Sequence, residues 1–551
     1  MQETRAGGRN MRNNRWFVPF SLFFLATAGI SDPPTEEWVV RYNGPGNADD
    51  TAYDMALDPD GNVYIAGSSY DDISSYDYVT IKYDSDGTEL WVRHYDGPAG
   101  SWDEAYAITL DDSCNVYVTG WSYGTTTSCD YATIKYDSEG NQLWVARYDG
   151  PDSDIDAGID IEVDKGYSVY VTGYSNSNST SYDYATVKYD IDGNEEWVVR
   201  YNGAADSYDE VTGLALDYYE NVIVTGSSIN LGPSADFATI SYDQDGSYLW
   251  KGVYNGPDNL IDFACDIAAD AFGNVVVTGV SDDSLNSRDY FTVMYNVNGD
   301  TVWTARYDGP DNDIDYAEAL AIDGSGNTYV TGESVGIDTY YDLATVKYDS
   351  DGNQQWVARY NGPLNDDDEA YAIAVDYMEN VYVAGYQTNA NDYYDILTIM
   401  YNTTGIEQWV MTYDGPAGDN DEACSVVADD EGNVYVTGYS YDPSTDYDIV
   451  TIKYSQSLNI GLSEDMNFSE FLSVSPNPSS GLLTISYNLS SSGGVDLVLY
   501  DISGRMVNEY SYAEQDSGTY QISVEGLEPG LYFCRLGTNS VSLTESFIVV
   551  D

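Results

Sequence analysis

The sequence predicts an all-β protein, and three observations support this fold class. Trp recurs at a fixed step of 53 residues, from Trp38 to Trp409. Between these tryptophans lie short segments in which apolar and polar residues alternate, separated by turns rich in Gly and Asp. No segment has a convincing helical period, and Gly and Asp recur too often for helices of useful length. The repeated unit is therefore expected to consist of strands.

The middle of the chain consists of one unit repeated eight times, without insertion or deletion. Eight copies of 53 residues run from Trp38 to Gly461. The tryptophans stand at positions 38, 91, 144, 197, 250, 303, 356 and 409. The same step repeats Tyr42, Gly44, Asp50, Asp58, Gly67, Asp77, Thr80 and Tyr83 in every copy. Such a period indicates a solenoid or a propeller.

Each unit reads as four short strands, and the second unit shows them in order. Its strands are expected at Ala105–Leu110, Asn115–Gly120, Asp130–Tyr136 and Leu143–Tyr148. In the third of these, Ala132, Ile134 and Tyr136 alternate with Tyr131, Thr133 and Lys135. Four antiparallel strands in a unit of this size predict a propeller blade.

The phase of the repeats predicts how the ring closes. The repeats begin with a lone fourth-strand segment, Trp38–Tyr42, and end with a unit that has three strands, up to Tyr454. Pairing these two pieces completes an eighth blade and leaves no open edge. The prediction is an eight-bladed β-propeller over residues 30–455, closed by N- and C-terminal strands and followed by a small C-terminal β-sandwich.

The recurrent Trp has two interpretations. A tryptophan ring can serve as a stacking platform for a sugar or a base. Because Trp occupies the outermost strand of every blade, we favour the alternative that it packs one blade onto the next.

Composition excludes several function classes. The chain has 93 acidic against 20 basic residues, a formal charge of −73, which argues against nucleic acid or anionic lipid as a partner. A single histidine, His94, removes most acid–base, triad and zinc chemistry. With 42% hydrophobic residues the chain is expected to fold. We therefore predict a folded, acidic, non-catalytic protein.

The N-terminus predicts export. Arg5, Arg9, Arg12 and Arg15 precede an apolar stretch, residues 16–28, that ends in Ala-Thr-Ala. A basic region, a short apolar core and a small-x-small site are typical of a secretory signal peptide, here residues 1–29. The alternative is a buried N-terminal strand. No later stretch is apolar enough to suggest a transmembrane span.

The repeats resemble a known family. Blocks such as Asn115–Gly120, Asp130–Tyr136 and Gly140–Trp144 are similar to the bacterial beta-propeller repeat (SBBP) found in extracellular proteins. The resemblance implies the propeller fold and an extracellular setting, but no reaction, because propellers host unrelated functions.

The C-terminal region carries a second resemblance. Residues 456–470 read as a linker, and residues 471–551 as short strands between turns rich in Ser and Gly. The blocks Ser475–Pro478, Leu499–Gly504 and Leu527–Tyr532 resemble the C-terminal sorting domain of the type IX secretion system. The resemblance implies the secretion machinery as a partner, and the outer surface of a Gram-negative bacterium or the medium as the destination. An ordinary accessory sandwich module is the alternative.

The blades differ most in the loop between their second and third strands. These loops are rich in Tyr, Ser and Asn, which are adaptable contact residues. They suit a polar, uncharged partner such as a polysaccharide, or else a surface protein. A solvated loop without a partner is the alternative. The candidate ligand-binding residues are Tyr70, Trp121, Tyr123, Tyr174, Tyr182, Tyr394, Tyr439 and Tyr441.

A recurrent acid forms the second candidate site. It precedes the innermost strand of each blade, near the expected mouth of the central channel. Carboxylates gathered there would attract a hard cation such as Ca²⁺, which prefers oxygen ligands. Alternatively, each accepts hydrogen bonds from backbone N–H groups of the preceding Gly-Pro loop. The eight residues are Asp50, Asp103, Asp156, Asp209, Asp262, Asp315, Asp368 and Asp421.

Three functions remain open on the sequence. The leading one is non-catalytic binding or adhesion through the loop face. The second is a purely structural surface component without a specific ligand. The third is a glycan hydrolase or lyase that works with paired carboxylates.

Overall fold

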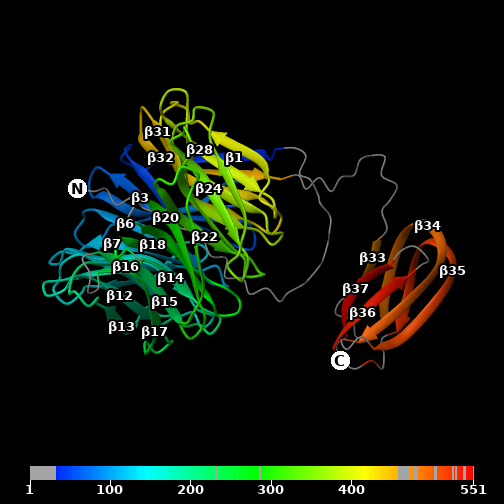
Figure 1. Cartoon of the computed structure of the whole chain (residues 1–551). Coiled ribbons are helices and arrows are strands. Elements are labelled where there is room, and N and C mark those ends of the chain that lie inside the picture. Colours follow the sequence, from blue (N-terminus) through cyan, green and yellow to red (C-terminus); the bar gives the residue numbers. More distant parts are fainter. Residues whose placement is uncertain are drawn as a thin grey trace. The chain divides into compact units, whose positions relative to one another are not determined.

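A computed structural model describes residues 33–229, 234–256, 258–283, 287–456, 471–475, 482–501, 505–523, 527, 530–537 and 542–549. The predicted signal peptide, and the predicted linker apart from Gln456, lie outside these residues. The chain divides into two compact units, Met1–Leu458 and Asn459–Asp551. The described residues form strands, turns and irregular segments without any helix (Figure 1).

The first unit is built from four-stranded antiparallel sheets, one for each repeat. Blade 1 consists of β2 (Asp50–Leu57), β3 (Val63–Asp71), β4 (Ser75–Tyr83) and β5 (Glu89–Tyr95), paired in that order. The first strand of each blade contacts the first strands of its neighbours, as β2 contacts β6 and β30. First strands therefore line the inside of the ring. The eight sheets confirm the predicted propeller.

The next six blades have the same strand order. Blade 2 is β6 (Asp103–Leu110), β7 (Val116–Tyr123), β8 (Cys129–Tyr136) and β9 (Gln142–Tyr148). Blade 3 is β10 (Asp156–Val163), β11 (Val169–Ser177), β12 (Ser181–Tyr189) and β13 (Glu195–Tyr201). Blade 4 is β14 (Asp209–Leu216), β15 (Val222–Ile229), β16 (Ala235–Tyr242) and β17 (Tyr248–Tyr254). Blade 5 is β18 (Asp262–Ala269), β19 (Val275–Asp282), β20 (Arg288–Tyr295) and β21 (Thr301–Tyr307). Blade 6 is β22 (Asp315–Ile322), β23 (Thr328–Val335), β24 (Tyr341–Tyr348) and β25 (Gln354–Tyr360). Blade 7 is β26 (Asp368–Val375), β27 (Val381–Thr388), β28 (Tyr394–Tyr401) and β29 (Glu407–Tyr413).

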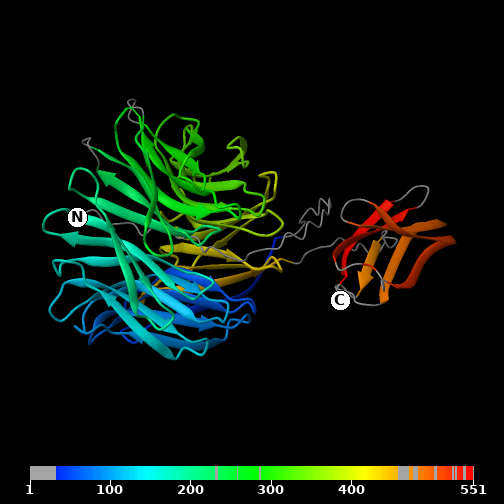
Figure 2. The same cartoon turned by 90° about the horizontal axis from the view of Figure 1, so that it is seen from below.

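Blade 8 combines both ends of the repeat region. Its sheet has the order β1-β32-β31-β30, where β1 is Thr35–Tyr42, β30 Asp421–Ala428, β31 Val434–Asp442 and β32 Asp446–Ser455. Strand β1 pairs antiparallel with β32, and Figure 2 shows the dark blue and orange strands side by side. Val427, Tyr435 and Ile449 of blade 8 share a core cluster with Val63 and Ile65 of blade 1.

A bulge near the start of each first strand explains one of the repeated glycines. In blade 1 the register of β2 against β3 shifts between Ala52 and Asp54. The β2 backbone lies so close that a Cβ on Gly67 would be 2.1 Å from the carbonyl oxygen of Thr51. Only glycine fits there, because this contact is with backbone that has no room to move.

The core lies between adjacent blades, and the repeated tryptophan belongs to it. Trp91 of β5 is 7% exposed and shares a core cluster with Tyr136 of blade 2. Its indole N–H donates to the carbonyl of Ser138, 3.2 Å away in the turn of blade 2. Gly140 in that turn has a φ of +78°, and a Cβ on it would lie 2.7 Å from the Trp91 ring. The tryptophan thus packs one blade onto the next.

The second unit contains β33 (Phe471–Ser475), β34 (Leu482–Asp501), β35 (Met506–Ser523), β36 (Gly530–Gly537) and β37 (Ser542–Val549). They form one sheet in the order β33-β34-β36-β37, with β35 also paired to β34. Leu497, Leu499, Cys534 and Leu536 are buried on it. The packing of two sheets into a sandwich stays a prediction.

Candidate functional site

The predicted tyrosines and the repeated aspartates lie at the same end of each blade. Asp50 begins β2 opposite Ser69, near the end of β3. The backbone N–H of Tyr70, next in the chain, donates to Asp50 Oδ1 at 3.2 Å. The turn from β3 to β4 and the segment that links one blade to the next therefore meet there. We call this end the loop face.

Five aromatic rings form a continuous row on the loop face across blades 1 and 2. Tyr70 contacts Tyr76 with a ring-centroid distance of 5.3 Å, and Tyr76 contacts Trp102 at 5.2 Å. Trp102 contacts Trp121 at 5.8 Å, and Trp121 contacts Tyr123 at 5.6 Å. Trp102 is 43% exposed and the other four are half-buried. We call these five residues the aromatic row.

A buried acid beneath the row fixes its two tryptophans. Glu104 is 8% exposed and accepts hydrogen bonds from Trp102 Nε1 at 2.7 Å and the Tyr106 hydroxyl at 2.8 Å. Trp121 Nε1 in turn donates to the Tyr106 hydroxyl at 2.8 Å. Burial raises the pKa of Glu104, and the hydrogen bonds from Tyr106 and Trp102 partly oppose this rise. Both indoles are therefore held in place before any ligand arrives, which lowers the entropy cost of binding.

Asp49 connects the row to blade 8. It accepts hydrogen bonds from the Tyr76 hydroxyl at 3.3 Å and from the backbone N–H of Tyr447 at 3.4 Å. Tyr447 contacts Tyr439 and Tyr441 at ring-centroid distances of 5.3 and 5.4 Å. Aromatic residues and a carboxylate thus extend over three neighbouring blades.

The other predicted residues lie in separate groups. Tyr182 contacts both Tyr174 and Tyr208 at 5.2 Å, and Tyr208 is 43% exposed. Tyr394 contacts Tyr386 of blade 7 at 4.1 Å. The eight predicted residues are all half-buried and are distributed over four groups. A binding role for them stays a prediction.

Several residues of these groups were missed by the sequence reasoning, notably Tyr76, Trp102, Glu104 and Tyr208. Trp102 carried a usable signal, because it is a tryptophan outside the 53-residue step. Its register is otherwise occupied by Asp, Ile, Tyr or Asn, so this position varies between blades.

The repeated aspartates are buried rather than open to the channel. Asp50 is 0% exposed, and its seven counterparts are 0 or 1% exposed. Each accepts a hydrogen bond from the glycine N–H six residues earlier, as Gly97 donates to Asp103 at 2.7 Å. The hydrogen bonds to the backbone of the linking loop, which were the alternative expected from sequence, are therefore present in every blade. The position near the mouth of the channel stays a prediction. A cation role for the whole ring stays a prediction.

Burial perturbs the titration of these aspartates. Desolvation raises the pKa of Asp50, Asp103 and Asp156 to about 6, although the glycine N–H lowers each in part. Asp315 and Asp421 also rise to about 6, and Asp368 to about 7.

Each blade has a second recurrent buried aspartate, Asp77 or its counterpart at the 53-residue step, near the same end of the blade. In five blades an arginine forms an ion pair with this aspartate. Arg147 Nη2 donates to Asp130 Oδ2 at 2.8 Å and to the carbonyl of Ser122 at 2.7 Å. The pairs are Arg41–Asp448, Arg147–Asp130, Arg200–Asp183, Arg306–Asp289 and Arg359–Asp342. In blades 1, 4 and 7 the arginine position holds His94, Val253 and Thr412.

Two family comparisons agree with this architecture. Residues 473–550 match the secretion system C-terminal sorting domain, and residues 37–73 and 355–394 match the beta-propeller repeat. Both resemblances seen in the sequence are thereby confirmed. The chain is a β-propeller protein with a C-terminal sorting domain, and that domain implies secretion or attachment to the cell surface. No helix among the described residues is long and apolar enough to cross a membrane.

Other similarities are more distant. An uncharacterized WD repeat-containing protein of Acanthamoeba polyphaga mimivirus is 22% identical over 390 residues, which is 64% of this chain and 26% of the mimivirus protein. The chain thus spans about a quarter of that relative.

The similarity to solved structures is weak. A eukaryotic initiation factor is 10% identical with a TM-score of 0.35, covering 66% of this chain and 88% of that one. A puromycin hydrolase is 11% identical with a TM-score of 0.42, covering 72% and 61%. A Synechocystis apocarotenoid oxygenase is 10% identical with a TM-score of 0.36, covering 70% and 95%.

Proposed function

We propose that this protein is a non-catalytic binding or adhesion module that holds an uncharged polysaccharide on the loop face. The observation that carries the proposal is the aromatic row with its anchored tryptophans. Exposed aromatic rings offer flat apolar area for the C–H faces of sugar rings, while Asp49 and the tyrosine hydroxyls offer partners for sugar hydroxyls.

The charge of the chain narrows the partner class. At a formal charge of −73 an acidic glycan would be repelled, whereas a neutral one is not. The two anchored indoles, Trp102 and Trp121, lie 5.8 Å apart with an interplanar angle of 47°, and they suit a linear chain of several sugar units better than a single sugar, because adjacent units can contact adjacent rings.

Delivery is the second part of the proposal. The sorting domain would take the chain through a type IX machinery to the outer-membrane surface of a Gram-negative bacterium, where the loop face meets polysaccharide or another surface protein. Carboxylate-based glycan cleavage and a purely structural role are the competing functions.

A glycan array with residues 30–551 tests the proposal, followed by affinity measurements on the best neutral polysaccharide. Trp102→Ala is expected to weaken binding about tenfold, as for a central aromatic contact. Phe272→Ala is the matched control, because Phe272 is 65% exposed but lies in the turn from β18 to β19, at the opposite end of its blade.

Equal affinities for both variants and the wild type would contradict the proposal. Shortened glycan products in the same samples would favour the hydrolase or lyase. Absence of any binding would favour the structural role.

A further inference from the structure

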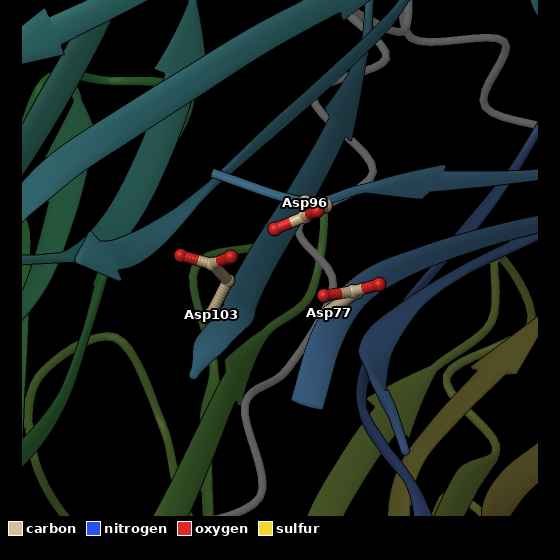
Figure 3. A group of neighbouring side chains, drawn as sticks. All are labelled: Asp77, Asp96 and Asp103. Atoms are coloured by element: carbon tan, nitrogen blue, oxygen red, sulfur yellow. The ribbon is translucent and has the colours of Figure 1, made fainter. Parts of the chain in front are cut away.

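Three carboxylates meet where blade 1 joins blade 2, and they come from three different segments. Asp77 lies on β4, Asp96 on the segment between β5 and β6, and Asp103 is the first residue of β6. One oxygen of each carboxylate lies within 4.8 Å of the other two, and Figure 3 shows the three groups around a common space. Asp77 and Asp103 are 6% and 0% exposed, whereas Asp96 is exposed.

One carboxylate oxygen in this cluster has no partner. Asp77 Oδ2 accepts a hydrogen bond from the Ser74 hydroxyl at 2.9 Å. Asp77 Oδ1 is buried and has no hydrogen-bond partner among the described residues. Asp103, by contrast, uses Oδ2 for the Gly97 N–H and Oδ1 for the Tyr123 N–H. A buried, unpartnered carboxylate oxygen is costly unless a cation or a donor reaches it.

The next joint shows what normally supplies the positive charge. Asp130, Asp149 and Asp156 form the same cluster between blades 2 and 3, and Asp130 Oδ1 likewise has no hydrogen-bond partner among the described residues. The difference is one of charge, because there the Arg147 guanidinium pairs with Asp130 Oδ2 at 2.8 Å. The equivalent residue of blade 1 is His94, whose Nε2 lies 2.9 Å from the Tyr42 hydroxyl. Within the described part of the chain no Lys or Arg forms an ion pair with Asp77.

Local charge makes the absence of a counter-ion unfavourable. Burial, opposed in part by the Ser74 hydrogen bond, and the negative charges of Asp96 and Asp103 together raise the pKa of Asp77 to about 6. Carboxylate oxygens are the ligands that Ca²⁺ prefers, at about 2.3–2.6 Å. Oxygens on opposite sides of one such ion are about 4.8 Å apart, so the spacing of the cluster fits a shared ion.

We propose that Asp77, Asp96 and Asp103 bind one Ca²⁺ ion, which joins blade 1 to blade 2 and supplies the charge that Arg147 supplies in blade 2. The buried carboxylates of the two blades are the fixed ligands. The exposed Asp96 closes the site from the solvent side and leaves room for water to complete the coordination shell. This inference does not depend on the proposed function.

A second arginine-free cluster lies between blades 7 and 8 but is better compensated. Asp395, Asp414 and Asp421 lie within 4.8 Å of one another. Here Asn389 Nδ2 donates to Asp395 at 2.6 Å, and the Arg41 charge lowers the pKa of Asp421. We therefore assign the ion to the joint between blades 1 and 2.

The test is a CaCl₂ titration by calorimetry on the metal-free chain, residues 30–551, at physiological salt so that weak surface binding is screened. The wild type is expected to bind one ion in its tightest class. Asp96→Asn should weaken this class at least tenfold. Asp149→Asn is the matched control in the joint that contains Arg147, and it should leave the class unchanged.

A second variant separates loss of the site from loss of folding. His94→Arg places a guanidinium in the register of Arg147, where it can pair with Asp77, so it should abolish tight Ca²⁺ binding without lowering the unfolding temperature of the metal-free protein. Ca²⁺ should raise the unfolding temperature of the wild type and Asp149→Asn but not of Asp96→Asn. Equal tight binding by wild type and Asp96→Asn, or by wild type and His94→Arg, would overturn the proposal.

Discussion

The tryptophans that recur every 53 residues differ in burial and hydrogen bonding from those outside this period, as Trp91 and Trp102 show. Trp91, on the step, is 7% exposed and donates to the backbone of the next blade. Trp102, outside it, is 43% exposed and donates to Glu104 two residues away. The comparison teaches that residues conforming to the period hold blades together, whereas those that depart from it shape the surface.

The largest expected effect comes from truncating a periodic tryptophan. Trp91→Ala should lower the free energy of unfolding by about 3–5 kcal/mol, because it leaves a cavity between two blades. Trp102→Ala should change it by less than about 1 kcal/mol, because the ring is largely at the surface. Urea denaturation followed by circular dichroism measures both; similar losses would remove the distinction.

An intermediate effect is expected where an arginine compensates a buried acid. Arg147→Gln should cost about 2 kcal/mol of unfolding free energy, because Asp130 would keep its charge without a counter-ion. This is below the usual range for buried pairs, since the Arg147 side chain is 22% exposed. His94→Gln, at the same register, should be nearly neutral in metal-free protein. Thermal unfolding of the two variants side by side provides the check, and equal shifts would refute the assigned role of Arg147.

A smaller effect concerns a single aspartate of the ring. The folded-state pKa of Asp156 is about 6, above its ordinary value of 3.8. The folded state therefore binds the proton more tightly, so this group stabilises the fold at low pH and loses that contribution as pH rises through about 6.

Asp156→Asn, which resembles the protonated form, should remove this part of the pH dependence. Between pH 4.5 and 7.5 the wild type should lose on the order of 1 kcal/mol more unfolding free energy than the variant. Parallel stability curves for the two proteins, measured by denaturant titration at several pH values, would show that Asp156 is not the titrating group.

The sequence predicted the features that recur with the 53-residue period. The step of Trp91 determined the number of blades, and the lone segment at Trp38 predicted the partner of β32. The Gly-Pro loop correctly suggested a hydrogen bond to Asp50.

Contacts between residues of different repeats were harder to predict from the sequence. Trp102 and Trp121 come from different loops, and their contact depends on how a linking segment lies beside a turn. The Arg147–Asp130 pair crosses two adjacent strands, so it needs the register of β8 and β9. The importance of His94 can be recognised only after that pair is known, because His94 occupies the position at which five other blades have an arginine.

The pairing of β1 with β32 also constrains the order of folding. Arg41 and Asp448 are 407 residues apart in sequence, yet they form one ion pair. Contacts of such separation form slowly, because the intervening chain must first be brought together. Strand β1 therefore has no partner until the last repeat has been synthesised, and the ring remains open until then. A chain truncated before β32 would expose an unpaired edge, which is a template for aggregation.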